Sequence, residues 1–120
     1  MRLTHKQALI TVFTLLDDLH DQIQSDTLLK LLRDMNPFIF TDHTPADPAI
    51  WDSWINCKKK TNNDALLTPD DILKILRLFL QLNEKRYGYN TSLILKDIQL
   101  PAFQNRWKEL LEKASKLTDI

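Results

Sequence analysis

The chain has 120 residues, 43% of them hydrophobic, and its 16 basic residues balance 16 acidic ones. A domain of this size can bury a core without metal or disulfide support, and the single cysteine excludes an internal disulfide. The neutral total gives no charge signature for nucleic-acid binding, and no apolar run approaches the roughly 18 residues of a membrane span. Residues 1–6 and the amphipathic stretch after them do not form a secretory signal, so we expect a cytoplasmic protein.

The composition predicts an all-α fold. Gly88 is the only glycine, whereas tight β-hairpins need glycine at their turns. Leucine is abundant and valine occurs once, at Val12, which favours helices over strands.

Six segments carry helix-start signals followed by apolar residues spaced by three and four positions. The first begins at a capping box, in which Thr4 pairs with Gln7. The expected N-caps are Thr4, Asp26, Asp47, Thr68 and Asn90, and Pro101 opens the last segment. In chain order the predicted helices are 5–24, 27–35, 48–60, 69–87, 91–99 and 101–116.

The two halves of the chain match each other. Leu3-Thr4 opens the first half and Leu67-Thr68 opens the second, and in each half a Pro-Ala pair precedes a tryptophan, Trp54 or Trp107, by the same spacing. We therefore predict a single six-helix domain built from two related three-helix halves, residues 3–60 and 67–117. A chance match between two leucine-rich helical segments is the alternative. We expect the two matching tryptophans to be core residues.

Residues 47–54 read Asp-Pro-Ala-Ile-Trp-Asp-Ser-Trp, and the chain opens with Leu3-Thr4 followed by Ala8. These motifs resemble the all-helical immunity proteins of bacterial contact-dependent growth inhibition systems, and the layout of the second half extends the resemblance over most of the chain. The resemblance implies a cytoplasmic protein that binds the toxic C-terminal domain of a large surface-delivered protein. Similar members neutralise tRNA-cleaving toxins, and one such toxin type uses the host cysteine synthase as an activator. The family's interfaces vary, so the resemblance implies no interface residue.

The sequence contains no constellation for catalysis or metal binding. His5, His20 and His43 lack metal-ligand spacing, and Cys57 has no histidine near it in sequence. One glycine cannot build a phosphate-binding loop. We expect a protein without enzymatic activity, cofactor or metal, in which Cys57 is a small core residue.

The two halves differ in charge. Residues 1–56 contain four basic and eight acidic side chains, a net charge of −4, and residues 57–120 contain twelve basic and eight acidic ones, a net charge of +4. This asymmetry predicts a directed electrostatic surface. Because a nuclease needs basic residues to grip phosphates, an acidic face with aromatic anchors would fit such a toxin.

On the first predicted helix, Ile10 and Phe13 lie beside carboxylates rather than inside the buried stripe centred on Val12. The loop after the second helix adds Phe38 and Phe40. Each of these residues also has an alternative interpretation that involves no partner. In that interpretation the acids only solvate a face of the helix, Ile10 packs against the second half, and the loop aromatics cover the core. The expected partner-binding residues are Ile10, Phe13, Asp17, His20, Asp21, Asp42, Asp47, Trp51 and Asp52.

The sequence also fits two other functions. One is a helical adaptor that joins proteins. The other is RNA binding, with basic side chains at residues 58–60 and 85–86 and with Tyr87 and Tyr89 as stacking platforms. The lysines equally fit the C-terminus of a helix, and the tyrosines fit a helix-ending turn around Gly88.

Overall fold

The computed structural model describes residues 1–118, which form one globule of six α-helices without a β-strand. The all-α, six-helix single domain predicted from the sequence is confirmed. Within this part of the chain no helix is both long and apolar enough to cross a membrane. The helices are α1 (His5–Ile23), α2 (Asp26–Met35), α3 (Pro48–Thr61), α4 (Pro69–Tyr87), α5 (Thr91–Asp97) and α6 (Pro101–Ser115).

The two longest helices begin in the same way. Each starts with a capping box, which joins Thr4 to Gln7 at α1 and Thr68 to Asp71 at α4. Gly88 ends α4 with a φ of 89°, a left-handed conformation that costs glycine little. These local signals explain why the predicted starts of α1 and α4 and the predicted end of α4 are confirmed.

The start of α2 differs from the prediction. Ser25, not Asp26, is the N-cap, and its hydroxyl accepts the N–H of Leu28 at 3.3 Å. Asp26 is the first helical residue, and its carboxylate interacts favourably with the positive end of the helix dipole. The fifth helix is also shorter than predicted and ends at Asp97 rather than Gln99.

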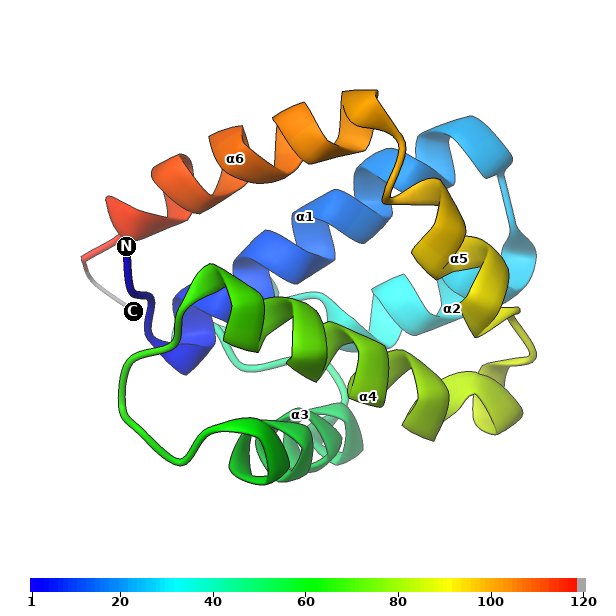
Figure 1. The fold of residues 1–120 in the computed structure, drawn as a ribbon. Helices are drawn as coiled ribbons and strands as arrows, with labels where there is room; N and C mark the ends of the chain where they lie inside the picture. The colour runs from blue at the N-terminus through cyan, green and yellow to red at the C-terminus, as the bar shows by residue number, and fades with distance from the viewer. Residues whose placement is uncertain (119–120) are drawn as a thin grey trace.

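The main helix pairs cross between the halves of the chain (Figure 1). α1 packs mainly along α6, and α4 packs mainly along α3. Leu3 and Leu67, which open the two halves, meet in an antiparallel bridge, where each N–H donates to the carbonyl of the other at 2.8 and 2.7 Å. Both leucines are fully buried. The beginnings of the two halves are therefore joined in the core.

One hydrophobic core holds all six helices together. Trp54 is fully buried and packs edge-on against Phe79, with 5.5 Å between ring centroids. Trp107 and Cys57 are buried as well, so the expectation that they are core residues is confirmed. Burial raises the pKa of the Cys57 thiol, which keeps it protonated.

Candidate protein-partner interface

One face of α1 carries four of the expected partner-binding residues. Phe13, Asp17, His20 and Asp21 follow each other at helical spacings, so they share this face. Asp17 and Asp21 are exposed, whereas Phe13 and His20 are half-buried. Partial desolvation, followed by the negative charges of Asp21 and Asp18, raises the pKa of Asp17. The carboxylates thus repel each other, and a basic partner would relieve that repulsion.

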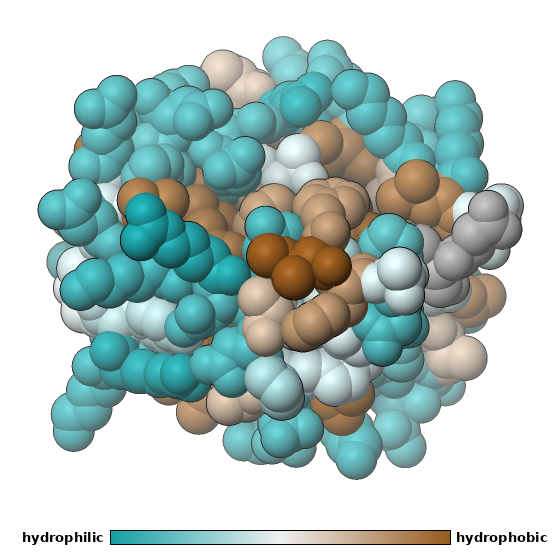
Figure 2. Space-filling view, turned by 180° about the vertical axis from the view of Figure 1, so that it is seen from behind, coloured by the Kyte–Doolittle hydropathy of each residue, from teal (hydrophilic) through white to brown (hydrophobic). Residues whose placement is uncertain are grey.

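The connection between α2 and α3 lies against this face and presents three exposed apolar side chains. Phe38, Ile39 and Phe40 are 57%, 62% and 47% exposed. Phe38 packs edge-on against Phe13 with 5.9 Å between ring centroids, which joins the connection to α1. Figure 2, which views the molecule from behind, shows hydrophobic side chains gathered near the middle of a face bordered by hydrophilic ones. Phe38 and Phe40 are therefore exposed, and they do not simply cover the core, as the alternative interpretation of the sequence expected.

Several contacts hold this connection in one shape. Lys6 Nζ donates to the carbonyl of Asp42 at 2.6 Å, and the His43 ring lies edge-on to Phe38, with 6.2 Å between centroids. His43 Nδ1 donates to the carbonyl of Pro37 at 3.1 Å. His43 itself has a φ of 60°, a left-handed conformation that only surrounding contacts can maintain in a residue other than glycine. These contacts constrain the conformation of the connection.

Asp42 belongs to the same connection, and its carboxylate stays exposed. The side chain and the backbone N–H of Thr44 donate to this carboxylate at 2.8 and 3.1 Å, and these bonds lower the pKa of Asp42. The side chain therefore keeps its negative charge beside the apolar residues. We define the loop surface as Phe13, Asp17, His20, Asp21, Phe38, Ile39, Phe40 and Asp42.

Ile10 is buried beside this surface and is not exposed on it. It is 6% exposed and, together with Phe38, Leu110 and Leu117, lines a groove of about 250 Å³ between α1, α6 and the α2–α3 connection. The prediction that Ile10 stands outside the buried stripe is wrong, and it packs against the second half. Because α6, α2 and α4 all pack on α1, its buried band is wider than one stripe.

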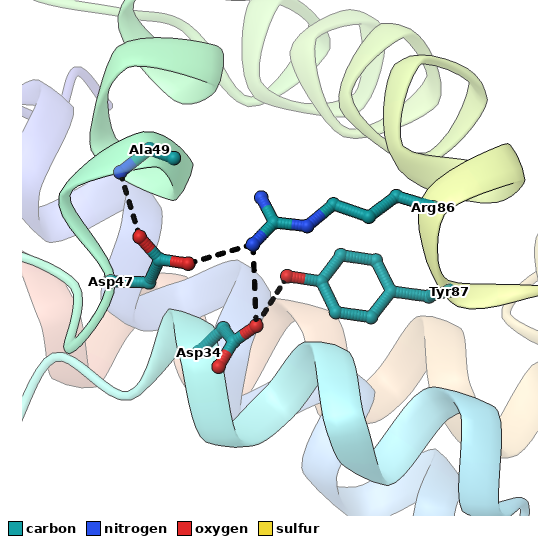
Figure 3. A network of polar contacts seen from close by, with 5 residues as sticks. All are labelled: Asp34, Asp47, Ala49, Arg86 and Tyr87. Atoms are coloured by element: carbon teal, nitrogen blue, oxygen red, sulfur yellow. Dashed lines mark hydrogen bonds and ion pairs between the residues drawn. The ribbon is translucent and has the colours of Figure 1, made fainter.

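The expected residues at the start of α3 have other contacts. Figure 3 shows that Asp47 points toward Arg86 on α4. Asp47 accepts the N–H of Ala49 at 2.9 Å as the N-cap, and it accepts a bond from Arg86 Nη2 at 2.8 Å. The bond from Ala49 and then the one from Arg86 lower the pKa of Asp47. Asp47 is thus engaged inside the molecule.

The same network reaches α2. Arg86 Nη2 lies 3.9 Å from the carboxylate of Asp34, which also accepts the hydroxyl of Tyr87 at 2.5 Å (Figure 3). Of the remaining α3 residues, Trp51 is half-buried and packs edge-on against His5 with 5.2 Å between centroids, and Asp52 is exposed. Among the described residues, neither side chain makes a hydrogen bond, an ion pair or an aromatic ring contact with the loop surface.

Some of the opposite charges of the two halves form ion pairs with each other within the molecule. Within residues 1–118, every ion pair between helices joins an acid of the first half to an arginine of the second. Arg106 binds Asp18 at 2.6 Å, and Arg86 binds Asp47 and Asp34. The external charge asymmetry is therefore smaller than the totals predict. Sequence reasoning missed these pairs because their partners lie far apart in the chain. The two pairs that are also hydrogen-bonded, Asp47–Arg86 and Asp18–Arg106, are separated by 39 and 88 positions.

The tyrosines of the RNA-binding alternative are used in packing. Tyr89 is 5% exposed, and its hydroxyl donates to the carbonyl of Leu80 at 2.6 Å. Its ring stacks on that of Tyr87, with 6.4 Å between centroids and an interplanar angle of 18°. Tyr89 is therefore not accessible as a platform for a base.

Among the described residues, no group of three or more histidine, cysteine, aspartate or glutamate side chains could hold a metal ion. No family model, curated protein or solved structure matches the chain.

Proposed function

We propose that this chain is a toxin-neutralising immunity protein. It binds the C-terminal toxin domain of a contact-dependent growth inhibition effector, a nuclease such as a tRNase, and blocks it. The observation that carries this proposal is the exposed apolar segment Phe38, Ile39 and Phe40 beside the acidic face of α1. The resemblance of residues 47–54 to such immunity proteins favours a toxin domain as the partner over the partner of an adaptor protein.

The apolar part of the loop surface has the character of a binding hot spot. Contiguous exposed apolar side chains on a small protein mark interaction sites, and the energy of an interface is concentrated in a few such residues near its centre. Phe38 is already held by Phe13 and His43. Because these contacts already constrain the segment, its binding to a partner would cost less conformational entropy than that of an unconstrained loop.

The acidic part of the loop surface selects a basic partner. Asp17 and Asp21 are exposed and make no ion pair within the described residues. A nuclease surface that grips phosphates is basic, so these charges would accelerate association and compete with the nucleic acid. The complex would form in the cytoplasm, and a host activator such as cysteine synthase could be bound to the toxin.

The test is co-expression of the tagged chain with the C-terminal region encoded by the open reading frame just upstream of its gene. We expect a 1:1 complex after purification, and we expect that region to kill cells when it is expressed alone. No complex and no toxicity would contradict the proposal and favour the adaptor.

A charge-reversal pair tests the surface itself. Asp17→Lys with Asp21→Lys should weaken the complex and slow association, because like charges would then face each other. Asp64→Lys with Glu112→Lys, which reverses two exposed acids outside the loop surface and changes the net charge by the same amount, is the matched control. Equal affinity of the folded double variant and the control would exclude this face of α1 from the interface.

A further inference from the structure

The two ends of the α2–α3 connection meet at its base. The N–H of Asp47, at the start of α3, donates to the carbonyl of Asp34, near the end of α2, at 3.0 Å. Between these residues the chain passes through two buried prolines, Pro37 and Pro45, whose rings fix their φ angles. The exposed residues 38–40 are thus carried by a loop with a closed base, and opening of the base would move them.

Two consecutive residues at the end of α4, Arg86 and Tyr87, hold this base, and we call them the clamp. Arg86 Nη2 lies 2.8 Å from the carboxylate of Asp47 and 3.9 Å from that of Asp34. The hydroxyl of Tyr87 donates to the Asp34 carboxylate at 2.5 Å. Figure 3 shows both side chains reaching from α4 into the space between the two carboxylates. The positive charge of Arg86 thereby offsets the repulsion between two negative charges that the closed base brings together.

The clamp is tied to the core through aromatic rings. The guanidinium carbon of Arg86 lies 5.2 Å from the centroid of the Tyr87 ring, which is a cation–π contact. The Tyr87 ring in turn stacks on the buried ring of Tyr89. Burial and then the bond to Asp34 raise the pKa of Tyr87, so its hydroxyl stays protonated and remains a donor. The position of the clamp is therefore set by α4 and by the turn that follows it.

The shorter connection between α5 and α6, which holds the matching place in the second half, is built without charged residues at the equivalent positions. Counting from the leucines that open the halves, the residues at the end of α1 that match the clamp are Gln22 and Ile23. The residues that match the two carboxylates are Ile98 and, counted from the helix-opening proline, Leu100. The packing shared by the two halves therefore needs no clamp, and the clamp accompanies the connection that exposes residues 38–40.

We propose that Arg86 and Tyr87 are positioning residues for the loop surface. They keep the base of the α2–α3 connection closed, and so they hold residues 38–40 in the conformation that binds the partner without touching the partner themselves. This inference rests on the proposed function, because it assigns the clamp to the same surface. Closure of the connection in the free protein is measured without a partner, so the two proposals can fail separately.

Amide hydrogen exchange of the free protein, followed by NMR, tests the closure. The N–H groups of Asp47 and His43 donate within the connection at 3.0 and 3.1 Å, whereas the N–H of Leu67 is bonded in the core. In the double variant Arg86→Met with Tyr87→Phe, exchange at the two connection sites should accelerate by about tenfold relative to the core site, because the lost bonds favoured the closed base. Equal acceleration at all three sites would indicate global destabilisation and, like unchanged exchange, would overturn the proposal.

The matched control is Lys85→Met with Tyr89→Phe, which also removes one cation and one hydroxyl near the end of α4. Lys85 is exposed and makes no ion pair within residues 1–118, whereas the Tyr89 hydroxyl is bonded to the carbonyl of Leu80 in the core. This control should destabilise the whole domain and leave the ratio of connection exchange to core exchange as in the wild type. Selective opening of the connection in the control would overturn the proposal, because any change at the end of α4 would then have the same effect.

Affinity for the toxin domain tests the positioning role. The double variant of the clamp should bind about tenfold more weakly than the wild type, because only molecules with a closed connection are competent to bind. Arg86→Lys, which keeps a positive charge at the base, should bind more tightly than Arg86→Met. Unchanged or tighter binding by the double variant, with its connection opened, would overturn the proposal. If the wild-type protein binds no toxin, the proposed function fails and the positioning role fails with it, whereas the exchange measurement still decides whether the clamp closes the connection.

Discussion

The α2–α3 connection, residues 36–47, and the α5–α6 connection, residues 98–100, hold matching places in the two halves. The longer one exposes Phe38, Ile39 and Phe40. The shorter one is a tight turn, in which the N–H groups of Gln99 and Leu100 bond back to the end of α5, and it leaves Leu100 exposed. The matching positions build the scaffold, whereas the added length of one half places apolar side chains on the surface.

The largest expected effect tests the scaffold positions. Trp54→Ala and Trp107→Ala should each lower the free energy of unfolding by about 3–5 kcal/mol, because both remove a buried aromatic side chain. Urea unfolding followed by circular dichroism measures the loss. Trp54→Phe should cost less, since Trp54 Nε1 makes no hydrogen bond that would be lost. A loss below about 1 kcal/mol for Trp107→Ala would break the equivalence of the halves.

The second-largest expected effect tests Ile39, an exposed apolar residue of the longer connection. Ile39→Asp should weaken toxin binding by about 30-fold or more, as expected for a hot-spot residue, and should change stability by less than about 0.5 kcal/mol. Leu93→Asp on α5 is the matched control, because Leu93 is 58% exposed and Ile39 is 62% exposed. Toxin affinities from surface plasmon resonance decide the matter. Similar losses in both variants would show that the longer connection has no special role.

The capping boxes give a smaller and symmetric effect. Thr4→Ala and Thr68→Ala each remove an N-cap hydroxyl, so each should lower the free energy of unfolding by about 1 kcal/mol. Denaturant midpoints at an unchanged m-value measure it. A loss confined to one variant would show that only one of the two long helices depends on its cap.

The smallest effect concerns the ion pair between Asp47 and Arg86, one of those that join the two halves. The pKa of Asp47 is lowered in the folded protein, so its contribution is present above the unfolded pKa and is lost as the pH falls through the folded one. Asp47→Asn keeps an N-cap residue but loses the charge, at a cost below about 1 kcal/mol at pH 7. Unfolding from pH 7 to pH 3 should show the gap to the wild type closing, and a constant gap would contradict the assignment.

Local signals predicted most of the fold. Caps and apolar spacing placed the six helices, and the errors lie at their ends. Ser25 and Asp26 are adjacent residues that can both cap a helix, and the path of the chain into α2 selects the serine. The fifth helix ends early because the chain after it tightens into a turn, in which the N–H groups of Gln99 and Leu100 donate to the carbonyls of Lys96 and Asp97.

The candidate site was only partly predictable. Helical spacing placed Phe13, Asp17 and Asp21 on one face, but Ile10 is covered by α6, whose position no local pattern reveals. Sequence reasoning named Phe38 and Phe40 and missed Ile39, because an isolated aliphatic residue in a loop has no periodicity. The bond from Arg86 to Asp47 depends on tertiary packing, which brings distant segments together.

The pairing of α1 with α6 has a consequence for synthesis. Of the six helices, α1 leaves the ribosome before the other five and is covered mainly by α6, which leaves it after the other five. Until residues 101–115 have emerged, the face of α1 around Ile10 is open to water and to chaperones. The domain therefore completes its folding only after α6 is free of the ribosome, and a nascent chain stalled before Pro101 would be a target for proteolysis.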